Sequence, residues 1–339
     1  MDERKRRVLQ AIILDYIATA DPVGSRTIAK KYNLGVSPAT VRNEMADLEE
    51  MGLIEQPHTS AGRIPSQSGY RYYVDCLMEK EPVRNETREM IRGALLNRMR
   101  ETEALIQMSG KLLSQLTSYT TLVLAPSMGQ NTLRHIQFLP VEREKAVMVI
   151  VLDNGHVEHR LIEAPEGLNE EDFHSISQLL NQHIRGLSLE NWRASVMQTI
   201  YRDLDYHRDL LGKFIAQVEN SLLVGQDQKV YLGGALNILN QPEFKDIDKV
   251  KTLMELLEEE SLMKEVLSPT DEDGVTVRIG TENMYEGLKD CSLITATYRF
   301  DGKIIGTLGV LGPTRMEYSK AISVLDFLTK ALSEGLNKL

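Results

Sequence analysis

The feature that most constrains the fold is a helix start at Ser37-Pro38, followed by an apolar stripe. A serine hydroxyl can accept a hydrogen bond from the free amides of a first helical turn. Proline at the first helical position does not destabilise the helix, because the backbone N–H that proline lacks would have no partner within the helix there. Val41, Met45 and Leu48 then recur at positions i, i+4 and i+7, on one helical face. The pattern predicts a helix that begins after Ser37 and leaves its opposite face to solvent.

Two more helices and a hairpin accompany this helix within the first 65 residues. Apolar residues recur at helical spacing between Leu9 and Ile17, and a second, shorter helix is expected with Ser25 as its N-cap. The segments Leu53–Gln56 and Arg63–Pro65 are typical of short strands on either side of a polar turn. Three helices followed by such a hairpin predict a winged helix-turn-helix domain.

The remaining chain mixes helical and strand patterns, which predicts an α+β multidomain protein. Charged residues and a proline mark a linker at 79–84. A long helix or helix pair is expected over residues 85–119, and residues 168–224 are almost wholly helical in pattern. Strands are expected at 121–125, 133–141, 146–153, 157–163, 275–279, 293–300 and 303–311, and further helices at 250–267 and 316–336.

The formal charge is unevenly distributed along the chain. The first 75 residues carry ten Lys and Arg and ten Asp and Glu, so the remaining 264 residues hold the entire net charge of −10. The acidic character therefore belongs to the distal part. It does not exclude an N-terminal domain that binds an anion such as DNA.

Several classes of protein are not supported by the sequence. The longest strictly apolar run, Ala146–Leu152, is seven residues, and no secretory signal pattern opens the chain, so we expect a cytoplasmic protein. Cys76 and Cys291 belong to no CxxC motif, which favours reduced, structural cysteines. His156 and His159 lack the spacing of metal ligands on one strand face, and no nucleotide-binding or hydrolase motif occurs. We expect no enzyme activity, no metal and no cofactor.

The outward face of the helix after Ser37 carries the residues expected to read DNA. Asn43 offers a paired donor and acceptor suited to adenine, and Arg42 suits guanine or a phosphate. Acidic residues crowd the C-terminal half of this helix, so its N-terminal turn is expected to enter the groove. The predicted contacts from this helix are Ser37, Ala39, Thr40, Arg42 and Asn43. A solvated polar face on a protein–protein module is the alternative.

The hairpin tip and the second helix supply the expected phosphate contacts, which position a protein without reading sequence. Small hydrogen-bonding residues and one arginine suit a loop that lies along a phosphate backbone or in a minor groove. The predicted wing and phosphate contacts are His58, Thr59, Ser60, Gly62, Arg63, Arg26 and Lys30. Further available cations are Arg4–Arg7, Lys31 and Arg71.

Four blocks of sequence resemble a known family. The segments Pro22–Thr27, Ser37–Asn43 and Gln56–Pro65, together with the distal block Gly306–Met316, are similar to the bacterial heat-inducible transcription repressors of the HrcA family. The blocks bracket nearly the whole chain, and the resemblance thins between Ala164 and Gln228.

The resemblance implies a homodimeric repressor of heat-shock chaperone operons that binds an inverted-repeat operator called CIRCE and is kept active by the chaperonin. It also implies a GAF-like mixed domain with an inserted, mostly helical dimerisation segment. On this basis we expect a winged-helix domain at 1–78, a linker at 79–84, a GAF-like domain at 85–165 and 227–339, and an inserted dimerisation segment at 166–226.

A dimer also follows from the expected mode of DNA binding. A single winged helix reads only a short half-site, and a two-fold protein on a palindrome doubles the contacts. The apolar stripe Trp192–Val218 is one dimerisation candidate, with packing on its own domain as the alternative; the residues proposed are Trp192, Ile200, Leu211 and Phe214. Two rival functions are a regulator whose GAF-like domain binds a small metabolite, and an enzyme with an accessory DNA-binding head.

Overall fold

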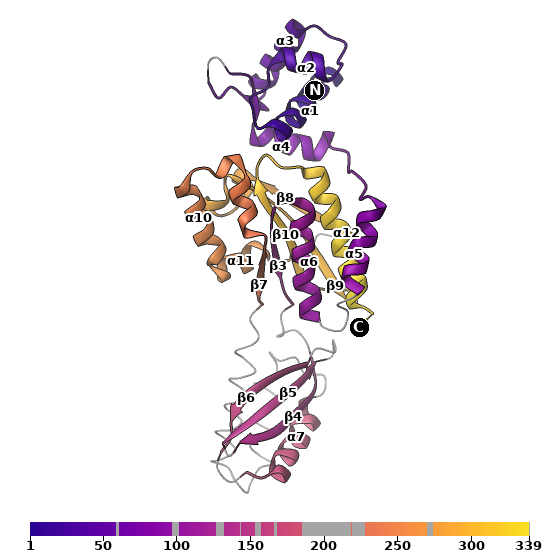
Figure 1. The fold of residues 1–339 in the computed structure, drawn as a ribbon, viewed down its shortest axis with the longest axis vertical. Coiled ribbons are helices and arrows are strands. Elements are labelled where there is room, and N and C mark those ends of the chain that lie inside the picture. The colour runs from indigo at the N-terminus through magenta and orange to yellow at the C-terminus, as the bar shows by residue number, and fades with distance from the viewer. Residues whose placement is uncertain are drawn as a thin grey trace. The chain divides into compact units, whose positions relative to one another are not determined.

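The computed structural model divides the chain into two compact units, each described by itself (Figure 1). The first comprises Met1–Leu124 and Val230–Lys338, and the second centres on Ala125–Lys229. The residues that the structure describes are 1–58, 61–96, 102–126, 132–142, 144–152, 157–165, 168–184, 218, 228–269 and 274–338. The predicted dimerisation residues Trp192, Ile200, Leu211 and Phe214 lie outside them, as do Thr59 and Ser60.

The N-terminal part of the first unit is a winged helix, as predicted, and we call residues 1–77 the head. Its elements are α1 (Glu3–Thr19), α2 (Ser25–Lys31), α3 (Pro38–Glu50), β1 (Ile54–Glu55), β2 (Ile64–Pro65), α4 (Gln67–Tyr72) and a π-helical turn η1 (Tyr73–Leu77). Ser37 caps α3 as predicted, by accepting a hydrogen bond from the Thr40 amide. The predicted N-cap of α2 was wrong by one residue, because Ser25 already lies in the helix and Gly24 precedes it with extended backbone.

A seven-residue linker and a helix pair follow the head. Residues 78–84 have no regular secondary structure. The pattern over 85–119 forms two helices, α5 (Asn85–Leu96) and α6 (Thr102–Thr117). Each buries part of the predicted apolar stripe, including Ile91 and Leu105, both fully buried.

The centre of the first unit is a five-stranded antiparallel sheet in the order β7-β3-β10-β9-β8. The strands are β3 (Thr120–Leu124), β7 (Val230–Gly233), β8 (Val275–Ile279), β9 (Cys291–Phe300) and β10 (Lys303–Pro313). The turn between β9 and β10 has positive φ at both Asp301 and Gly302, the backbone that a tight two-residue hairpin requires. We call this sheet and its covering helices the central domain.

Side-chain alternation along these strands accounts for helices on both faces of the sheet. Val123 and Val310 belong to one hydrophobic core, whereas Leu122 and Leu311 belong to another. Successive residues of a strand point to opposite faces, so each face acquires its own core. One face carries α5, α6 and α12 (Tyr318–Leu336), and the other carries α10 (Ile247–Glu258) and α11 (Glu260–Val266) (Figure 1). Short 3-10 turns complete this domain at Ala235–Asn240, Pro242–Phe244, Gly280–Glu282 and Glu286–Leu288.

The second unit contains a three-stranded antiparallel sheet in the order β4-β5-β6, covered by α7. Its elements are β4 (Leu133–Glu142), β5 (Lys145–Leu152), β6 (Val157–Glu163) and α7 (Glu170–Ile184). The outer edge of β4 is satisfied by α7: the Ile136 amide donates to Asn181 Oδ1 at 2.8 Å, and the Phe138 amide donates to Ser177 Oγ at 3.1 Å. The helix thereby blocks an edge that could otherwise pair with another strand.

The division differs from the one expected from the sequence. We expected strands 133–141, 146–153 and 157–163 to belong to the same domain as residues 227–339. Instead, β4, β5 and β6 form a sheet of their own and bury Ile136 and Met148 in a separate core with Phe173. Strand propensity does not say which sheet a strand joins. Within the described residues, we find no helix whose length and hydropathy would suit a membrane span.

Candidate nucleic-acid interface

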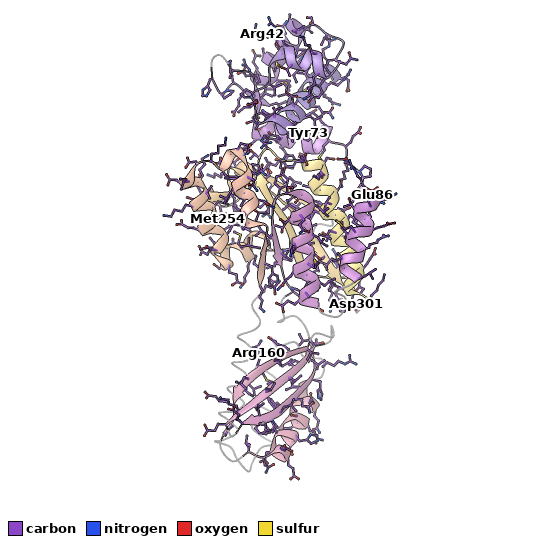
Figure 2. All side chains as sticks on the ribbon, viewed as in Figure 1. Arg42, Tyr73, Glu86, Arg160, Met254 and Asp301 are labelled. Carbon is purple, nitrogen blue, oxygen red and sulfur yellow. The ribbon has the colours of Figure 1, made fainter. Side chains whose placement is uncertain are left out.

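The exposed face of α3 carries the residues predicted to read bases. Val41 and Leu48 are fully buried in the head's core, whereas Ala39, Arg42 and Asn43 are exposed on the opposite side. Figure 2 labels Arg42 on α3. Ser37 and Thr40 lie at the same end of the helix, with their hydroxyl oxygens 2.9 Å apart. The structure thus brings these five predicted residues to the first half and outer face of one helix. This is the part that a major groove accepts.

Two acidic residues of α3, Glu44 and Asp47, are paired with cations of the head. Glu44 is buried and forms ion pairs with Arg4 and Lys5, and Lys5 also lies 2.9 Å from Asp47. Hydrogen bonding to Asp47 and then to Glu44 raises the pKa of Lys5, so this ammonium stays charged. Arg4 and Lys5 are therefore partly committed to α3, and they reduce the repulsion that its carboxylates would exert on a phosphate backbone.

The wing is held close to the turn before α2. Val23 and Arg63 exchange two backbone hydrogen bonds of 2.9 Å, which adds a third segment beside β1 and β2. Gly62 is required by this approach, because a Cβ there would lie 2.5 Å from the carbonyl carbon and oxygen of Val23. His58 is exposed at the tip. The close approach of the two backbones therefore explains why position 62 is a glycine, independently of any contact with DNA.

Arg63 is engaged within the head. Its guanidinium lies 2.7 Å from a carboxylate oxygen of Glu49, near the C-terminal end of α3. This contact braces the wing against α3. Beside it, a hollow of about 500 Å³ opens between the start of α2, α3 and the wing; among its lining residues are Ser25, Arg42 and Gln56.

The structure separates free cations from engaged ones. Arg26, Lys30 and Arg42 are exposed and form no ion pair with another described residue. Lys31, by contrast, lies 2.5 Å from the buried carboxylate of Asp15. The interpretation of Arg71 as an available phosphate contact was wrong, because its guanidinium points into the central domain, as described below.

Contacts between the head and the central domain were missed at the sequence level. Arg71 forms an ion pair with Glu282, Gln67 bonds to the turn that contains Thr281, and Arg315 donates to the backbone carbonyl of Ile17. These partners are more than 200 positions apart in the chain. No local pattern marks such pairs, so only the tertiary structure reveals them.

Comparisons with known proteins match the head and the distal part of the chain to two separate family models. Residues 1–74 match the family model described as "Winged helix-turn-helix transcription repressor, HrcA DNA-binding", and residues 103–322 match "HrcA protein C terminal domain". Proteins named "Heat-inducible transcription repressor HrcA" from Pelotomaculum thermopropionicum and Moorella thermoacetica are 52% and 49% identical to this chain. Each alignment covers 100% of this chain and 98% or 99% of the relative.

A solved structure shares the overall fold. It is titled "Crystal structure of a hypothetical protein at 2.2 A resolution", and it aligns over 100% of this chain and 99% of its own with a TM-score of 0.69 and 24% sequence identity. At this identity the likeness supports the fold alone.

Proposed function

Because the chain belongs to the HrcA family of heat-inducible transcription repressors, we propose that it represses heat-shock chaperone operons by binding an inverted-repeat operator of the CIRCE type. The observation that carries this proposal is the outer face of α3. There, Arg42 and Asn43 stand exposed on a helix whose opposite side, including Val41, is locked in the core. Such a helix is the reading element of a winged helix-turn-helix.

Base and phosphate contacts are divided between two sets of residues. Asn43 is suited to a bidentate hydrogen bond with adenine, and Arg42 to guanine or an adjacent phosphate. Arg26 and Lys30 are free to neutralise phosphates beside the groove, together with the exposed tip of the wing at His58. The proposed interface therefore combines sequence reading by α3 with non-specific attraction from α2 and the wing.

We propose that the operator is bound by a homodimer. The sheet of the second unit supports this, since α7 covers only one of its faces. On the other face, Leu139, Val147 and Leu161 lie opposite one another across three strands, and Leu139 and Leu161 are 45% and 63% exposed. Exposed apolar rows of this kind are typical of association surfaces. The stripe Trp192–Val218 remains a second candidate surface.

The remaining features of the proposal rest on the family. We propose that the central domain is GAF-like, that the chaperonin maintains the active repressor in the cytoplasm, and that heat or misfolded protein removes the active form. A chaperonin test compares operator affinity of the heated and cooled protein with and without chaperonin and ATP. Full, heat-stable affinity without chaperonin would contradict this part of the proposal.

The DNA-binding proposal is tested with the full-length protein and fluorescently labelled duplexes. We expect the protein to bind a palindromic operator at least about 10³-fold more tightly than a scrambled duplex, which is the lower end of the range for specific DNA-binding proteins. Lys30→Ala should weaken binding to both duplexes and lower the salt dependence by about one unit. Lys303→Ala, in the β9–β10 hairpin of the central domain, is the matched control and should change neither. A monomeric protein that does not distinguish the two duplexes would refute the proposal.

A metabolite-sensing regulator is the rival function. It predicts that a small molecule bound in the central domain changes affinity for the operator, whereas the repressor proposed here responds to heat and chaperonin alone. A thermal-shift screen of the full-length protein, followed by operator titration with any compound that binds, separates the two.

A further inference from the structure

The head is held on the central domain by a cluster of polar contacts at α4. Arg71 forms an ion pair with Glu282, and its guanidinium also donates to the carbonyl oxygen of Val277 at 2.6 Å. Gln67 Oε1 accepts hydrogen bonds of 2.9 Å from both the amide and the hydroxyl of Thr281, and its Nε2 donates to the carbonyl oxygen of Lys289 at 3.2 Å. We call this set the clamp: Gln67, Arg71, Val277, Thr281, Glu282 and Lys289.

The central domain is shaped to receive the clamp. Gly280 has φ of +56°, and a Cβ at this position would lie 2.1 Å from the amide carbon of Gln67. Glu282 is also oriented from its own side, because it accepts a hydrogen bond of 2.8 Å from the Ile279 amide. A carboxylate held in place loses less side-chain entropy when it binds an arginine, so the interaction is more directional than an ordinary surface ion pair.

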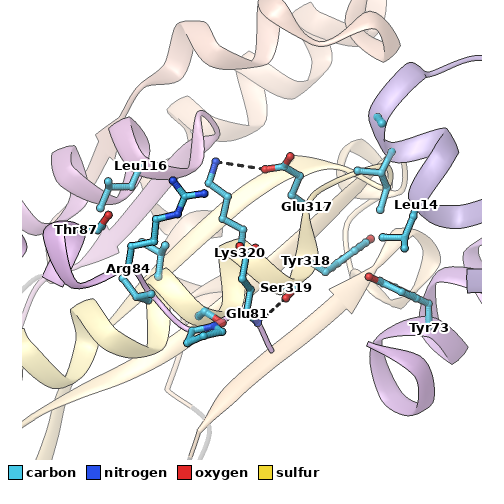
Figure 3. Close-up of a pocket in the computed structure, with 16 residues that line it drawn as sticks. Leu14, Tyr73, Glu81, Arg84, Thr87, Leu116, Glu317, Tyr318, Ser319 and Lys320 are labelled. Atoms are coloured by element: carbon cyan, nitrogen blue, oxygen red, sulfur yellow. Dashed lines mark hydrogen bonds and ion pairs between the residues drawn. The ribbon is translucent and has the colours of Figure 1, made fainter. Parts of the chain in front are cut away.

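Two more contacts tie the linker and α1 to the same domain. Ser319 Oγ accepts a hydrogen bond of 2.8 Å from the Glu81 amide and donates to the carbonyl oxygen of Glu79 at 2.7 Å, as Figure 3 shows for the first of these. Arg315 lies 2.5 Å from Glu243 and donates to the carbonyl oxygen of Ile17 at 2.5 Å. The short linker is therefore bound at Glu79 and Glu81 to Ser319 near the start of α12, which limits how far the head can turn.

Packing alone does not fix the head on the linker side. A hollow of about 580 Å³ lies between α1, the linker and the start of α12 (Figure 3); Leu14, Tyr73, Arg84 and Lys320 are among its lining residues. Tyr70 and Tyr318 do meet in the shared core, with ring centroids 5.9 Å apart. Apolar contacts are less directional than hydrogen bonds, so the clamp on the α4 side constrains the orientation of the head more specifically than the shared core does.

We propose that Gln67 and Arg71 are positioning residues for operator recognition, which rests on the proposed DNA-binding function. They touch no DNA, yet they set the angle at which α3 is presented. In a two-fold repressor that angle and the dimer together determine the half-site spacing that both heads can reach. A rigidly held head loses little conformational entropy when it binds at the correct half-site spacing. At any other spacing it binds poorly, because the head cannot turn to reach the half-site.

The test uses full-length protein and a series of duplexes whose two half-sites are separated by stepwise increments of one base pair. We expect the wild type to prefer one spacing by at least tenfold. The double variant Gln67→Ala/Arg71→Met should lose at least tenfold in affinity at that spacing and bind all spacings within about threefold, as for loosely tethered sites. Its affinity for a duplex with one half-site should change less than twofold, since the face of α3 is intact. A merely structural role would lower all affinities alike.

Arg84→Met is the matched control, because Arg84 lies in the linker and makes no ion pair or side-chain hydrogen bond with another described residue. It should keep the spacing preference. A second readout needs no DNA: amide exchange of α4 should accelerate in the double variant while that of α3 stays unchanged. If the double variant exchanges faster in α4 but retains the wild-type spacing preference, the clamp does not position the head. If α4 exchange is also unchanged, the clamp does not hold the head at all. Failure of the wild type to bind any duplex would instead count against the proposed function.

Discussion

Substitution of Gly62 by alanine tests whether the wing depends on the close approach of two backbone segments. The added Cβ would lie 2.5 Å from the carbonyl carbon and oxygen of Val23 and 2.8 Å from the carbonyl carbon of Pro22. These are backbone atoms, so no side-chain rotation can relieve the clash. Relief requires the wing to move away, which breaks the two reciprocal hydrogen bonds between Val23 and Arg63. At about 0.5–1.5 kcal/mol each, their loss costs about 1–3 kcal/mol.

Amide hydrogen exchange measures this loss at the place where it occurs, which a global unfolding curve of a multidomain chain does not. A cost of about 1–3 kcal/mol should accelerate exchange of the Val23 and Arg63 amides by about 5- to 150-fold, at tenfold per 1.4 kcal/mol. Affinity for DNA should fall in parallel. Gly93→Ala is the control, because nothing lies within 4 Å of its added Cβ in α5, and it should stabilise that helix by about 0.5–1 kcal/mol. Unchanged exchange at both amides in Gly62→Ala would refute the reasoning.

Three further predictions concern other parts of the molecule. Asn43→Ala should cost about 1–3 kcal/mol of specific binding, measured by competition between operator and scrambled duplex, and unchanged discrimination would remove Asn43 from the reading face. Burial raises the pKa of the Cys291 thiol to about 12, so a thiol reagent at pH 8 should label only the exposed Cys76 before denaturation; two fast thiols would contradict this. Burial alone would raise the pKa of Glu282, but hydrogen bonds from Arg71 and a backbone amide outweigh it and lower the pKa. The ionised Glu282 therefore stabilises the clamp fully above its unfolded pKa of about 4.3. This stabilisation is lost as the pH falls through the lowered pKa of the folded state, so α4 should lose amide protection in acid. The same acid profile in Glu282→Gln would show that another group is responsible.

Much of the head follows from local chemistry. The cap at Ser37 and the spacing of Val41, Met45 and Leu48 predicted α3 and its exposed face, and the structure confirms both. This works because capping and helical periodicity depend on neighbours within a few residues. The strands were predicted for the same reason, although their assignment to two sheets was not, since alternation specifies which side of a strand is buried and not its partner.

Tertiary structure decided which of the charged side chains form ion pairs. Lys30 and Lys31 are neighbours of the same type, yet Lys30 forms no ion pair with another described residue while Lys31 is paired with Asp15 across the head. Arg71 is of a residue type that often contacts phosphate, but it forms an ion pair with Glu282, 211 positions further along the chain. The sequence by itself determined the elements and the residue types on α3. Only folding decided which cations can still reach DNA, because the energy of an ion pair depends on a distance in space that local sequence does not encode.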